Sequence, residues 1–321
     1  MTARIIVLDG HTLNPGDNPW TPLQALGETV VYPRTPADEV LARSREADVL
    51  VVNKQRLPAE VLEQLPRLKL VAVSATGYDC VDVDAARRRG VTVCNVPVYG
   101  TDSVAQHVLA LLLTLCHQPS RHDAAVRAGR WTESPDFCFW DSPQVELAGL
   151  TLGVIGFGRI GRRVGELGQA LGMRVLACSR KRENPPPWPR FAWAELEEML
   201  PRADVVSLHC NLNAENAGMV NAQFLSQMKP TAMLINTARG ALVVESDLAE
   251  ALNAGRLAAA AVDVASQEPI RPDNRLLTAR NCLITPHLAW ATLAARRRLL
   301  NTTAENIAAF LAGEPRNVVA G

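Results

Sequence analysis

The sequence predicts an α/β protein made of two Rossmann-like or flavodoxin-like domains, each built on a parallel sheet. Short apolar runs alternate with helical segments along almost the whole chain, which is the pattern of βα units. Three glycines, Gly156, Gly158 and Gly161, follow one of these runs in the spacing G-x-G-x-x-G. The chain has 321 residues, long enough for two domains of ordinary size.

The first part of the chain, roughly 100 residues long, reads as a complete small βα domain. Its apolar runs predict strands at 4–8, 29–32, 49–52, 68–73 and 91–96, with helices at 36–46, 58–65 and 82–89. A proline-containing loop is expected to join the first two strands. The fourth strand ends in the polar loop Ser74-Ala75-Thr76-Gly77-Tyr78.

A long helix and an irregular segment come next. Apolar residues at helical spacing predict a largely buried helix over 101–116, and a more polar helix is expected over 120–129. Residues 131–147 have little periodicity but contain Phe137, Phe139 and Trp140. These aromatics could form an interface or fold back onto their own core, and the sequence favours neither alternative.

The glycine motif opens the second domain, because apolar runs at 150–155 and 173–178 enclose it in the order strand, turn, helix, strand. In this context the motif predicts a dinucleotide site. The first glycine allows a tight turn, the second a close approach of the pyrophosphate, and the third close packing of the helix. The pyrophosphate is expected beside Arg159 and Ile160 at the helix N-terminus, where unpaired N–H groups favour an anion. A glycine-rich turn without a ligand is the alternative.

The rest of this domain continues the alternation. We expect strands at 204–208, 232–235, 258–262 and 282–284, with helices at 191–200, 221–228 and 245–253. A final helix at 292–311 is too long to be a simple cap and is expected to cross back to the first domain.

Composition argues against several classes of function. The 33 basic and 33 acidic residues balance, so no general attraction to nucleic acid or an anionic membrane is expected. The seven cysteines show no metal-binding spacing and favour free thiols in a reducing cytosol. The chain opens without a signal-peptide pattern, and its longest apolar stretch, 108–116, is too short to span a bilayer. We therefore expect a cytoplasmic protein without a metal, nucleic-acid or membrane partner.

Three residues that follow predicted strands could carry chemistry, because ligands bind at the carboxyl ends of parallel strands. His287 could shuttle a proton near neutral pH, Glu268 could fix the tautomer of that histidine, and Arg239 could grip a carboxylate. Each also has a structural interpretation, as a core histidine, a turn residue or a loop-binding arginine. Residue type and spacing alone leave both interpretations open.

A resemblance to a known family adds to this reading. The segments that carry it are ATGYDCVD (75–82), YGTDSVAQHVLALLL (99–113), VIGFGRIGRRV (154–164), LINTARGALV (234–243), AAVDVASQEP (260–269) and ITPHLAW (284–290). They resemble the D-isomer-specific 2-hydroxyacid dehydrogenases, and most closely the hydroxypyruvate/glyoxylate reductase (glycerate dehydrogenase) branch. The resemblance implies a substrate-binding domain made from 1–98 and 290–321, with an NAD(P)-binding domain, 99–289, inserted in it.

The resemblance also implies roles for the strand-end residues. Arg239 would hold the substrate carboxylate and orient its keto group. His287 would donate a proton to the carbonyl oxygen as hydride arrives from the nicotinamide, and Glu268 would hydrogen-bond His287. The backbone N–H groups of the loop Ala75–Tyr78 would bind the same carboxylate from the other domain.

Further positions are implied around the cofactor and at a subunit contact. His209, Thr237, Ala238 and Asp263 would line the cofactor site, with Asp263 near the nicotinamide carboxamide. Trp140 resembles an aromatic that reaches the active site of a neighbouring subunit in this branch, which implies a homodimer.

The cofactor preference is predicted from the end of the second strand of the cofactor domain. NAD-dependent members usually carry an acid there, bonded to the ribose hydroxyls, whereas this chain has Ser179 followed by Arg180, Lys181 and Arg182. An acid would repel a 2′-phosphate, and this basic run would hold one. We therefore expect NADP(H) in preference to NAD(H); the alternative is a solvated basic turn with NAD bound.

The predicted function is NAD(P)H-dependent reduction of a small 2-ketoacid, glyoxylate or hydroxypyruvate, to the D-2-hydroxyacid. A dinucleotide-sensing scaffold of the corepressor type has the same fold and the same three residues, but no extended tail is expected after the last helix. Phosphoglycerate dehydrogenase is a second alternative, disfavoured because no appended regulatory domain is expected. Glu268 argues against formate dehydrogenase, which carries Gln at this position.

Overall fold

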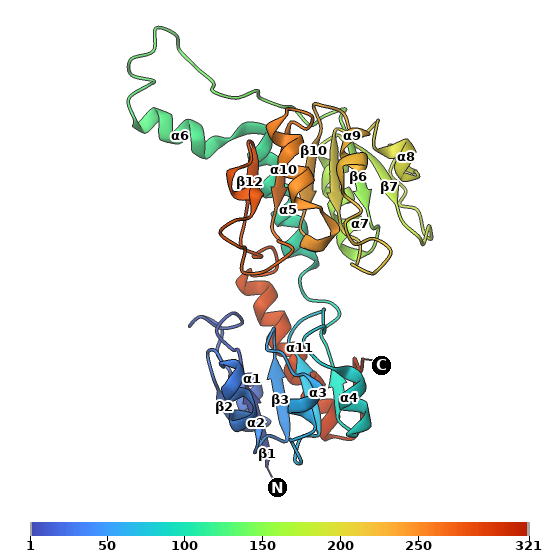
Figure 1. Cartoon of the computed structure of the whole chain (residues 1–321). Helices are drawn as coiled ribbons and strands as arrows, with labels where there is room; N and C mark the ends of the chain where they lie inside the picture. Colours follow the sequence, from blue (N-terminus) through green and yellow to red (C-terminus); the bar gives the residue numbers. More distant parts are fainter. Residues whose placement is uncertain (1, 320–321) are drawn as a thin grey trace. The chain divides into compact units, whose positions relative to one another are not determined.

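The computed structural model describes residues 2–319 and divides into two compact units (Figure 1). One unit combines Met1–Gly100 with Trp290–Gly321, and we call it the split unit. The other, Thr101–Ala289, lies between these two parts in the sequence, and we call it the inserted unit. The sequence expectation placed the two boundaries after residues 98 and 289.

The split unit holds a five-stranded parallel sheet of order β2-β1-β3-β4-β5, the flavodoxin-like order. Its strands are β1 (Ala3–Val7), β2 (Gly27–Val31), β3 (Val49–Val52), β4 (Leu70–Val73) and β5 (Thr92–Cys94). Its helices are α1 (Thr21–Gln24), η1 (Ala37–Glu39), α2 (Val40–Ser44), α3 (Ala59–Leu62), α4 (Val83–Arg88) and α11 (Leu293–Leu311).

Alternate residues of β1 face opposite sides of this sheet, as the strand pleat requires. Ile6 belongs to the core cluster shared with α2, α3 and α4. Ile5 and Val7 belong to the cluster on the other face, to which α11 contributes Leu299 and Ile307. The last helix of the chain thus completes the fold of the first domain, as the sequence predicts.

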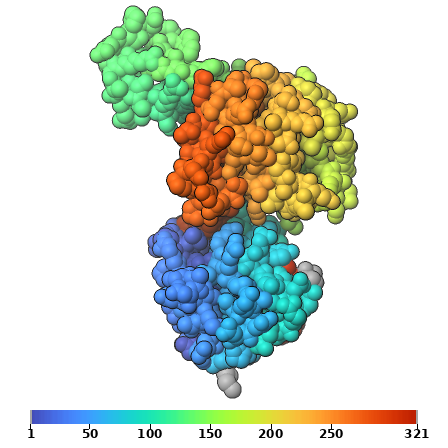
Figure 2. All heavy atoms as spheres, viewed as in Figure 1, coloured from blue at the N-terminus to red at the C-terminus, as the bar shows by residue number. Residues whose placement is uncertain are grey.

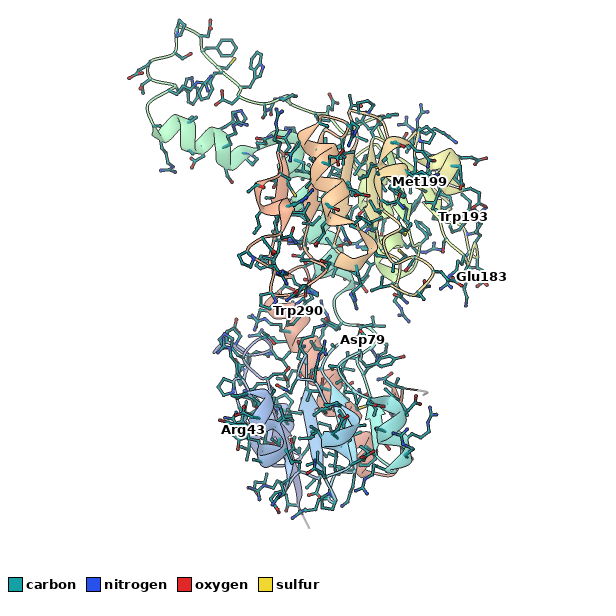
Figure 3. The ribbon with its side chains drawn as sticks, in the orientation of Figure 1. Arg43, Asp79, Glu183, Trp193, Met199 and Trp290 are labelled. Carbon is teal, nitrogen blue, oxygen red and sulfur yellow. The ribbon has the colours of Figure 1, made fainter. Side chains whose placement is uncertain are left out.

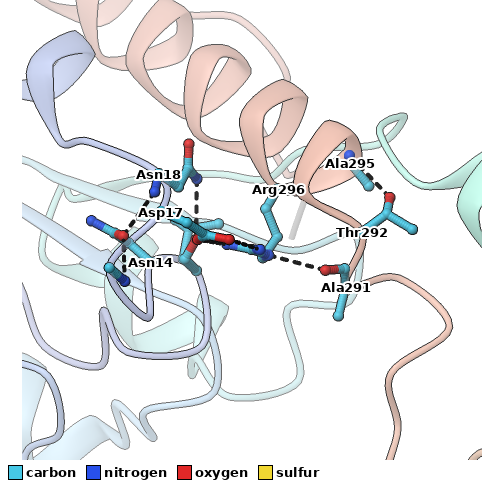
Figure 4. A network of polar contacts seen from close by, with 9 residues as sticks. Asn14, Asp17, Asn18, Ala291, Thr292, Ala295 and Arg296 are labelled. Carbon is cyan, nitrogen blue, oxygen red and sulfur yellow. Dashed lines mark hydrogen bonds and ion pairs between the residues drawn. The ribbon is translucent and has the colours of Figure 1, made fainter.

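A buried arginine ties α11 to the loop after β1 (Figure 4). The Arg296 guanidinium donates to both carboxylate oxygens of Asp17, at 2.6 and 2.7 Å, and to the carbonyls of Leu13 and Ala291. A bidentate pair of this kind has a defined geometry. It anchors a loop that contains no strand to the helix that covers the sheet.

The inserted unit holds a seven-stranded parallel sheet of order β12-β11-β10-β9-β6-β7-β8. Its strands are β6 (Thr151–Ile155), β7 (Arg174–Cys178), β8 (Phe191–Trp193), β9 (Val205–Leu208), β10 (Met233–Asn236), β11 (Ala259–Val262) and β12 (Cys282–Ile284). Its helices are α5 (Thr101–His117), α6 (Pro119–Arg127), α7 (Arg159–Ala170), α8 (Leu196–Met199), α9 (Ala222–Ser226), η2 (Gly240–Leu242), α10 (Glu245–Asn253) and η3 (Arg275–Thr278). The predicted architecture of parallel α/β sheets is confirmed.

The predicted helix over 191–200 is wrong in its first half. Phe191 and Trp193 belong to strand β8, which pairs with β7, and only Leu196–Met199 is helical. In an extended strand these two rings share one face, and their centroids lie 5.2 and 5.3 Å from the ring of Phe157. Figure 3 labels Trp193 and Met199 at this edge of the sheet. The expected loop between β1 and β2 also contains a short helix, α1, that the sequence reading missed.

A polar arm follows α5. Helix α6 buries none of its residues, and the segment after it, drawn in green, extends from the body of the inserted unit (Figure 2). Side chains hold the arm together locally: Arg130 pairs with Asp141 and lies over the ring of Phe139, 4.5 Å from its centroid. The ring of His122 accepts from the Asp141 N–H at 3.1 Å.

In each unit, the two points at which the chain passes to or from the other unit lie side by side. In the inserted unit, the Ser103 hydroxyl at the start donates to the Ala289 carbonyl at the end, at 2.7 Å. In the split unit, the rings of Tyr99 and Trp290 meet edge to face with centroids 6.4 Å apart.

Candidate nucleotide-binding and catalytic site

The glycine motif lies at the topological switch point of the inserted sheet. Read from β6, the chain proceeds to β7 and β8 on one side and to β9 through β12 on the other, and dinucleotides bind at the carboxyl ends of strands at such a point. Gly156 follows β6 with φ of +93°, and a Cβ there would lie 2.4 Å from the Cys210 nitrogen. A Cβ on Gly161 would lie 2.0 Å from the Gly156 carbonyl oxygen.

The N-terminus of α7 is open. Gly158 is its N-cap, no side chain caps it, and a Cβ on Gly158 would meet nothing within 4 Å. The first amides of a helix have no intrahelical partner, so this end presents N–H groups, those of Arg159 and Ile160 among them, and positive potential to an anion. Both features fit a dinucleotide pyrophosphate.

The basic run after β7 is only partly free. Arg182 forms an ion pair with Glu195. Among the described residues, Arg180 and Lys181 form no ion pair, and both side chains are exposed after the half-buried Ser179. Arg180 also lies near enough to Cys210, which follows β9, for its charge to lower the pKa of that thiol, although burial, the larger effect, raises it. The free Arg180 thus lies beside the switch point.

The ends of β9 and β10 supply further polar groups. Burial lowers the pKa of His209 to about 3, so its ring is uncharged near neutral pH, and Nε2 hydrogen-bonds the Ser207 hydroxyl at 2.8 Å. The hydroxyl of Thr237 is buried and has no hydrogen-bond partner among the described residues. A buried hydroxyl without a partner is uncommon, and a ligand at this edge would provide one.

Arg239 is presented by a tight turn after β10. The buried Asn236 side chain closes the turn, accepting from the Ala238 N–H at 3.0 Å and donating to the Arg239 carbonyl at 2.9 Å. A Cβ on Gly240 would lie 1.9 Å from the carbonyl carbon of Ala265, so this glycine lets the turn lie against the segment after β11. The exposed guanidinium donates only to the Ala238 carbonyl among the described residues.

His287 and Glu268 meet directly. His287 Nδ1 and Glu268 Oε2 are 2.6 Å apart, and the Ala265 N–H donates to the other carboxylate oxygen at 3.2 Å. The histidine side chain is 28% exposed. Since Nδ1–H donates to the carboxylate, Nε2 is left to exchange a proton with a ligand.

Asp263 lies beneath this pair. Its side chain is buried, and its carboxylate accepts from the Thr285 hydroxyl at 2.6 Å and from the N–H groups of Leu288 and Ala289, both at 2.9 Å. His107 of α5 lies 3.5 Å away. The sequence reading missed both His107 and Thr285. The predicted contact of Asp263 with the carboxamide stays a prediction.

The predicted carboxylate-binding loop follows β4 of the split unit. Thr76 anchors it, because its hydroxyl donates to the Val96 carbonyl at 2.9 Å and its carbonyl accepts from Asn95 at 2.7 Å. The N–H groups of Ala75, Thr76, Gly77 and Tyr78 donate to no acceptor among the described residues. Free consecutive amides can bind an anion.

Trp140 lies on the arm of the inserted unit. It is 65% exposed, and Phe137 is 89% exposed. Of the two alternatives for these aromatics, folding back onto a core is excluded for these two side chains within this unit.

Two classes of feature are absent from residues 2–319. No group of three or more His, Cys, Asp or Glu side chains there could hold a metal ion. No helix in that part of the chain is long and apolar enough to cross a membrane. All seven cysteines are free thiols.

An open helix N-terminus, a glycine that leaves room for a ligand, and a histidine–carboxylate pair stand at the carboxyl edge of one Rossmann sheet. This combination defines a dinucleotide-dependent oxidoreductase. Comparisons with known proteins place it more closely. The model of the D-isomer specific 2-hydroxyacid dehydrogenase NAD binding domain matches residues 109–289. This chain belongs to the D-isomer specific 2-hydroxyacid dehydrogenase family, and it is an NAD(P)-dependent enzyme.

Similar proteins indicate the branch of the family to which this chain belongs. A hydroxypyruvate reductase of Blautia hydrogenotrophica is 47% identical over 98% of this chain and 99% of its own. A glycerate dehydrogenase of Methylorubrum extorquens is 36% identical over 99% of both chains. The crystal structure of an NADPH-dependent glyoxylate/hydroxypyruvate reductase from Sinorhizobium meliloti, in complex with NADP and malonate, has a TM-score of 0.83 and 31% identity, covering 100% of this chain and 97% of that one.

Proposed function

We propose that this enzyme reduces glyoxylate or hydroxypyruvate to the D-2-hydroxyacid, with hydride from NADPH. The observation that carries the proposal is the 2.6 Å contact between His287 and Glu268, beside an open dinucleotide site. The names of the relatives, hydroxypyruvate reductase and glycerate dehydrogenase, support the substrate class.

In this proposal the inserted unit binds the cofactor and the split unit supplies part of the substrate site. Arg239 forms a bidentate pair with the substrate carboxylate, and the amides of the loop Ala75–Tyr78 bind the same group. His287 donates a proton from Nε2 to the carbonyl oxygen, and Glu268 stabilises the charged imidazole by accepting from Nδ1. The nicotinamide supplies the hydride when it is bound.

The cofactor preference rests on the end of β7. Ser179 leaves room for a 2′-phosphate that an acid would repel, and Arg180 and Lys181 are free to pair with it. Two structural relatives support this choice: an acyclic imino acid reductase in complex with NADPH, and the Sinorhizobium meliloti glyoxylate/hydroxypyruvate reductase in complex with NADP. In the same proposal Thr237 and Asp263 lie against the cofactor, and neutral His209 faces it without adding charge.

We also propose a cytoplasmic homodimer. The exposed rings of Phe137 and Trp140 are apolar groups that a second copy would cover, and Trp140 would then reach the partner's site. The free cysteines are consistent with a reducing compartment.

A panel assay tests the proposal. Glyoxylate, hydroxypyruvate, pyruvate, phenylpyruvate and 3-phosphohydroxypyruvate are each offered with NADPH and NADH, and absorbance at the reduced-nicotinamide band is followed. We expect the highest kcat/KM with glyoxylate or hydroxypyruvate and NADPH. No turnover of any 2-ketoacid would instead support a dinucleotide-sensing scaffold, and preference for the phosphorylated substrate would support phosphoglycerate dehydrogenase.

The proposed roles predict different defects in two variants. His287→Ala removes the proton donor, so kcat falls by about 100- to 10,000-fold, the usual contribution of general acid–base catalysis. Arg239→Ala removes the carboxylate partner, so KM for glyoxylate rises and kcat also falls. Both variants should retain the melting temperature of the wild type, because both side chains are partly exposed. Wild-type rates in either variant would place the chemistry elsewhere.

A further inference from the structure

We propose that His107 and Thr285 are positioning residues for His287, acting through Asp263. The inference rests on the proposed function, since it assigns to both residues a role in proton donation by His287. Neither touches the reacting atoms in this proposal. They fix the backbone from which the imidazole projects.

The backbone at His287 needs such support. Its φ is +51°, in the left-handed region that a residue with a Cβ rarely adopts. Residues in such a conformation persist where the surroundings over-determine them. Here the His287 N–H donates to the Asp263 carbonyl at 2.7 Å and to the Thr285 carbonyl at 3.0 Å.

Asp263 holds the next two residues as well. Its carboxylate accepts from the N–H groups of Leu288 and Ala289 at 2.9 Å. One residue at the end of β11 therefore binds three successive amides, from His287 to Ala289, through its carbonyl and its carboxylate. The direction of the His287 side chain depends on where Asp263 stands.

Thr285 and His107 fix that carboxylate in turn. The Thr285 hydroxyl donates its single proton to Asp263 Oδ1 at 2.6 Å, so its oxygen can only accept from His107 Nε2, 3.1 Å away. His107 comes from α5, 178 positions away in the chain. Burial alone raises the pKa of Asp263, but His107, Thr285 and the two amides outweigh burial and hold that pKa below its usual range. The carboxylate therefore stays ionised and keeps its donors.

Loss of the Thr285 hydroxyl would break this series of hydrogen bonds between His107 and Asp263. Asp263 would lose its shortest hydrogen bond, and His107 Nε2 would lose its 3.1 Å partner and keep only Asp263 Oδ1, 3.5 Å away. The loop that carries His287 could then shift, and a small misplacement of a reacting group can cost a large factor in rate. Asp263 would keep the two amide donors that hold it in place, so binding of the cofactor should change much less than kcat. Binding of the substrate carboxylate depends on other residues and should change little.

The test compares Thr285→Val with Thr285→Ser. Valine has the shape of threonine without the hydroxyl, and serine keeps the hydroxyl. With glyoxylate and NADPH, we expect Thr285→Val to lower kcat by about tenfold or more, with KM for glyoxylate and Kd for NADPH within about twofold of wild type. Thr285→Ser should retain wild-type kcat. The solvent isotope effect on kcat should rise in Thr285→Val, because proton donation becomes slower.

A second pair of variants, at His107, tests whether a loss of kcat comes from the lost hydrogen bond and not from misfolding. His107→Gln keeps an N–H donor at this site and His107→Leu does not, so only the leucine variant should lower kcat. Wild-type kcat in both Thr285→Val and His107→Leu would overturn the inference while leaving the proposed function intact. An equal loss of NADPH affinity and kcat would also overturn it, because the network would then serve the cofactor site. No turnover by the wild type would remove the proposed function itself, and the inference with it.

Discussion

The side chain at position 179 follows β7, where the ribose of a dinucleotide binds in Rossmann folds. We predict that Ser179→Asp reverses the cofactor preference. A carboxylate would repel a 2′-phosphate and accept hydrogen bonds from a free ribose, so the ratio of kcat/KM for NADPH to that for NADH should fall by about 10- to 100-fold, the value of one charged hydrogen bond. Steady-state kinetics with both cofactors measure it.

Two neighbouring arginines provide the matched control for this prediction. Arg182 is paired with Glu195, whereas Arg180 forms no ion pair among the described residues. Arg180→Gln should therefore raise KM for NADPH more than Arg182→Gln does. Equal effects of the two variants, or none, would favour the solvated basic turn with NAD bound.

The identity of single residues was more predictable than their connections. His287, Glu268 and Arg239 can be singled out because each follows an apolar run that predicts a strand. His107 could not be, since its partner Thr285 is 178 positions away and its own surroundings in the sequence are those of an apolar helix. The left-handed backbone of His287 has no sequence signature, because histidine does not require that conformation.

At the scale of the element, two glycines of the strand–turn–helix unit of β6 and α7 have different roles, Gly161 in packing and Gly158 in ligand binding. A Cβ on Gly161 would lie 2.0 Å from a backbone oxygen, whereas one on Gly158 would meet nothing. We predict that Gly161→Ala lowers the free energy of unfolding by about 1–3 kcal/mol, the usual cost of overpacking. Gly158→Ala should fold almost as well as the wild type and should bind NADPH more weakly, because its methyl group projects into the space left for the ligand.

Thermal unfolding and titration with NADPH distinguish the two glycine variants. Unchanged NADPH affinity in a folded Gly158→Ala protein would show that the pyrophosphate does not approach this glycine. A stable Gly161→Ala protein would show that α7 can move away from β6 at little cost.

Local pattern predicted most elements but failed where packing overrides it. A helix is predicted over 191–200, yet Phe191 and Trp193 pack against Phe157 from an extended strand. The aromatic cluster that decides this includes Phe157, more than 30 positions before the strand, which a short sequence window does not contain. The same limit applies to α1, whose sequence of four residues is too short for periodicity.

At the scale of the whole molecule, the inserted unit has its own sheet, two core clusters and all three catalytic candidates. We predict that residues 101–289, expressed alone, fold and bind NADPH but do not reduce glyoxylate, because the loop Ala75–Tyr78 is missing. Circular dichroism, NADPH titration and the glyoxylate assay check the three parts. Turnover by this fragment would show that the split unit contributes nothing essential to the substrate site.

The strand orders of the two sheets could not be read from local pattern, because alternation specifies parallel sheets but not which strands are neighbours. The prediction that one domain is inserted in the other came from the resemblance to a known family. The net charge of zero and the spacing of the cysteines restricted the class of protein, but they carry no information on the order of the strands.

The paired chain crossings bear on how such a protein can be taken apart and rebuilt. Because Tyr99 and Trp290 lie against each other, a short glycine-rich linker could replace everything between them and leave the split unit as one continuous chain. The hydrogen bond between Ser103 and Ala289 likewise closes the excised piece into a cassette with adjacent ends, the form in which domains are tolerated as insertions. The protein thus offers two modules for grafting.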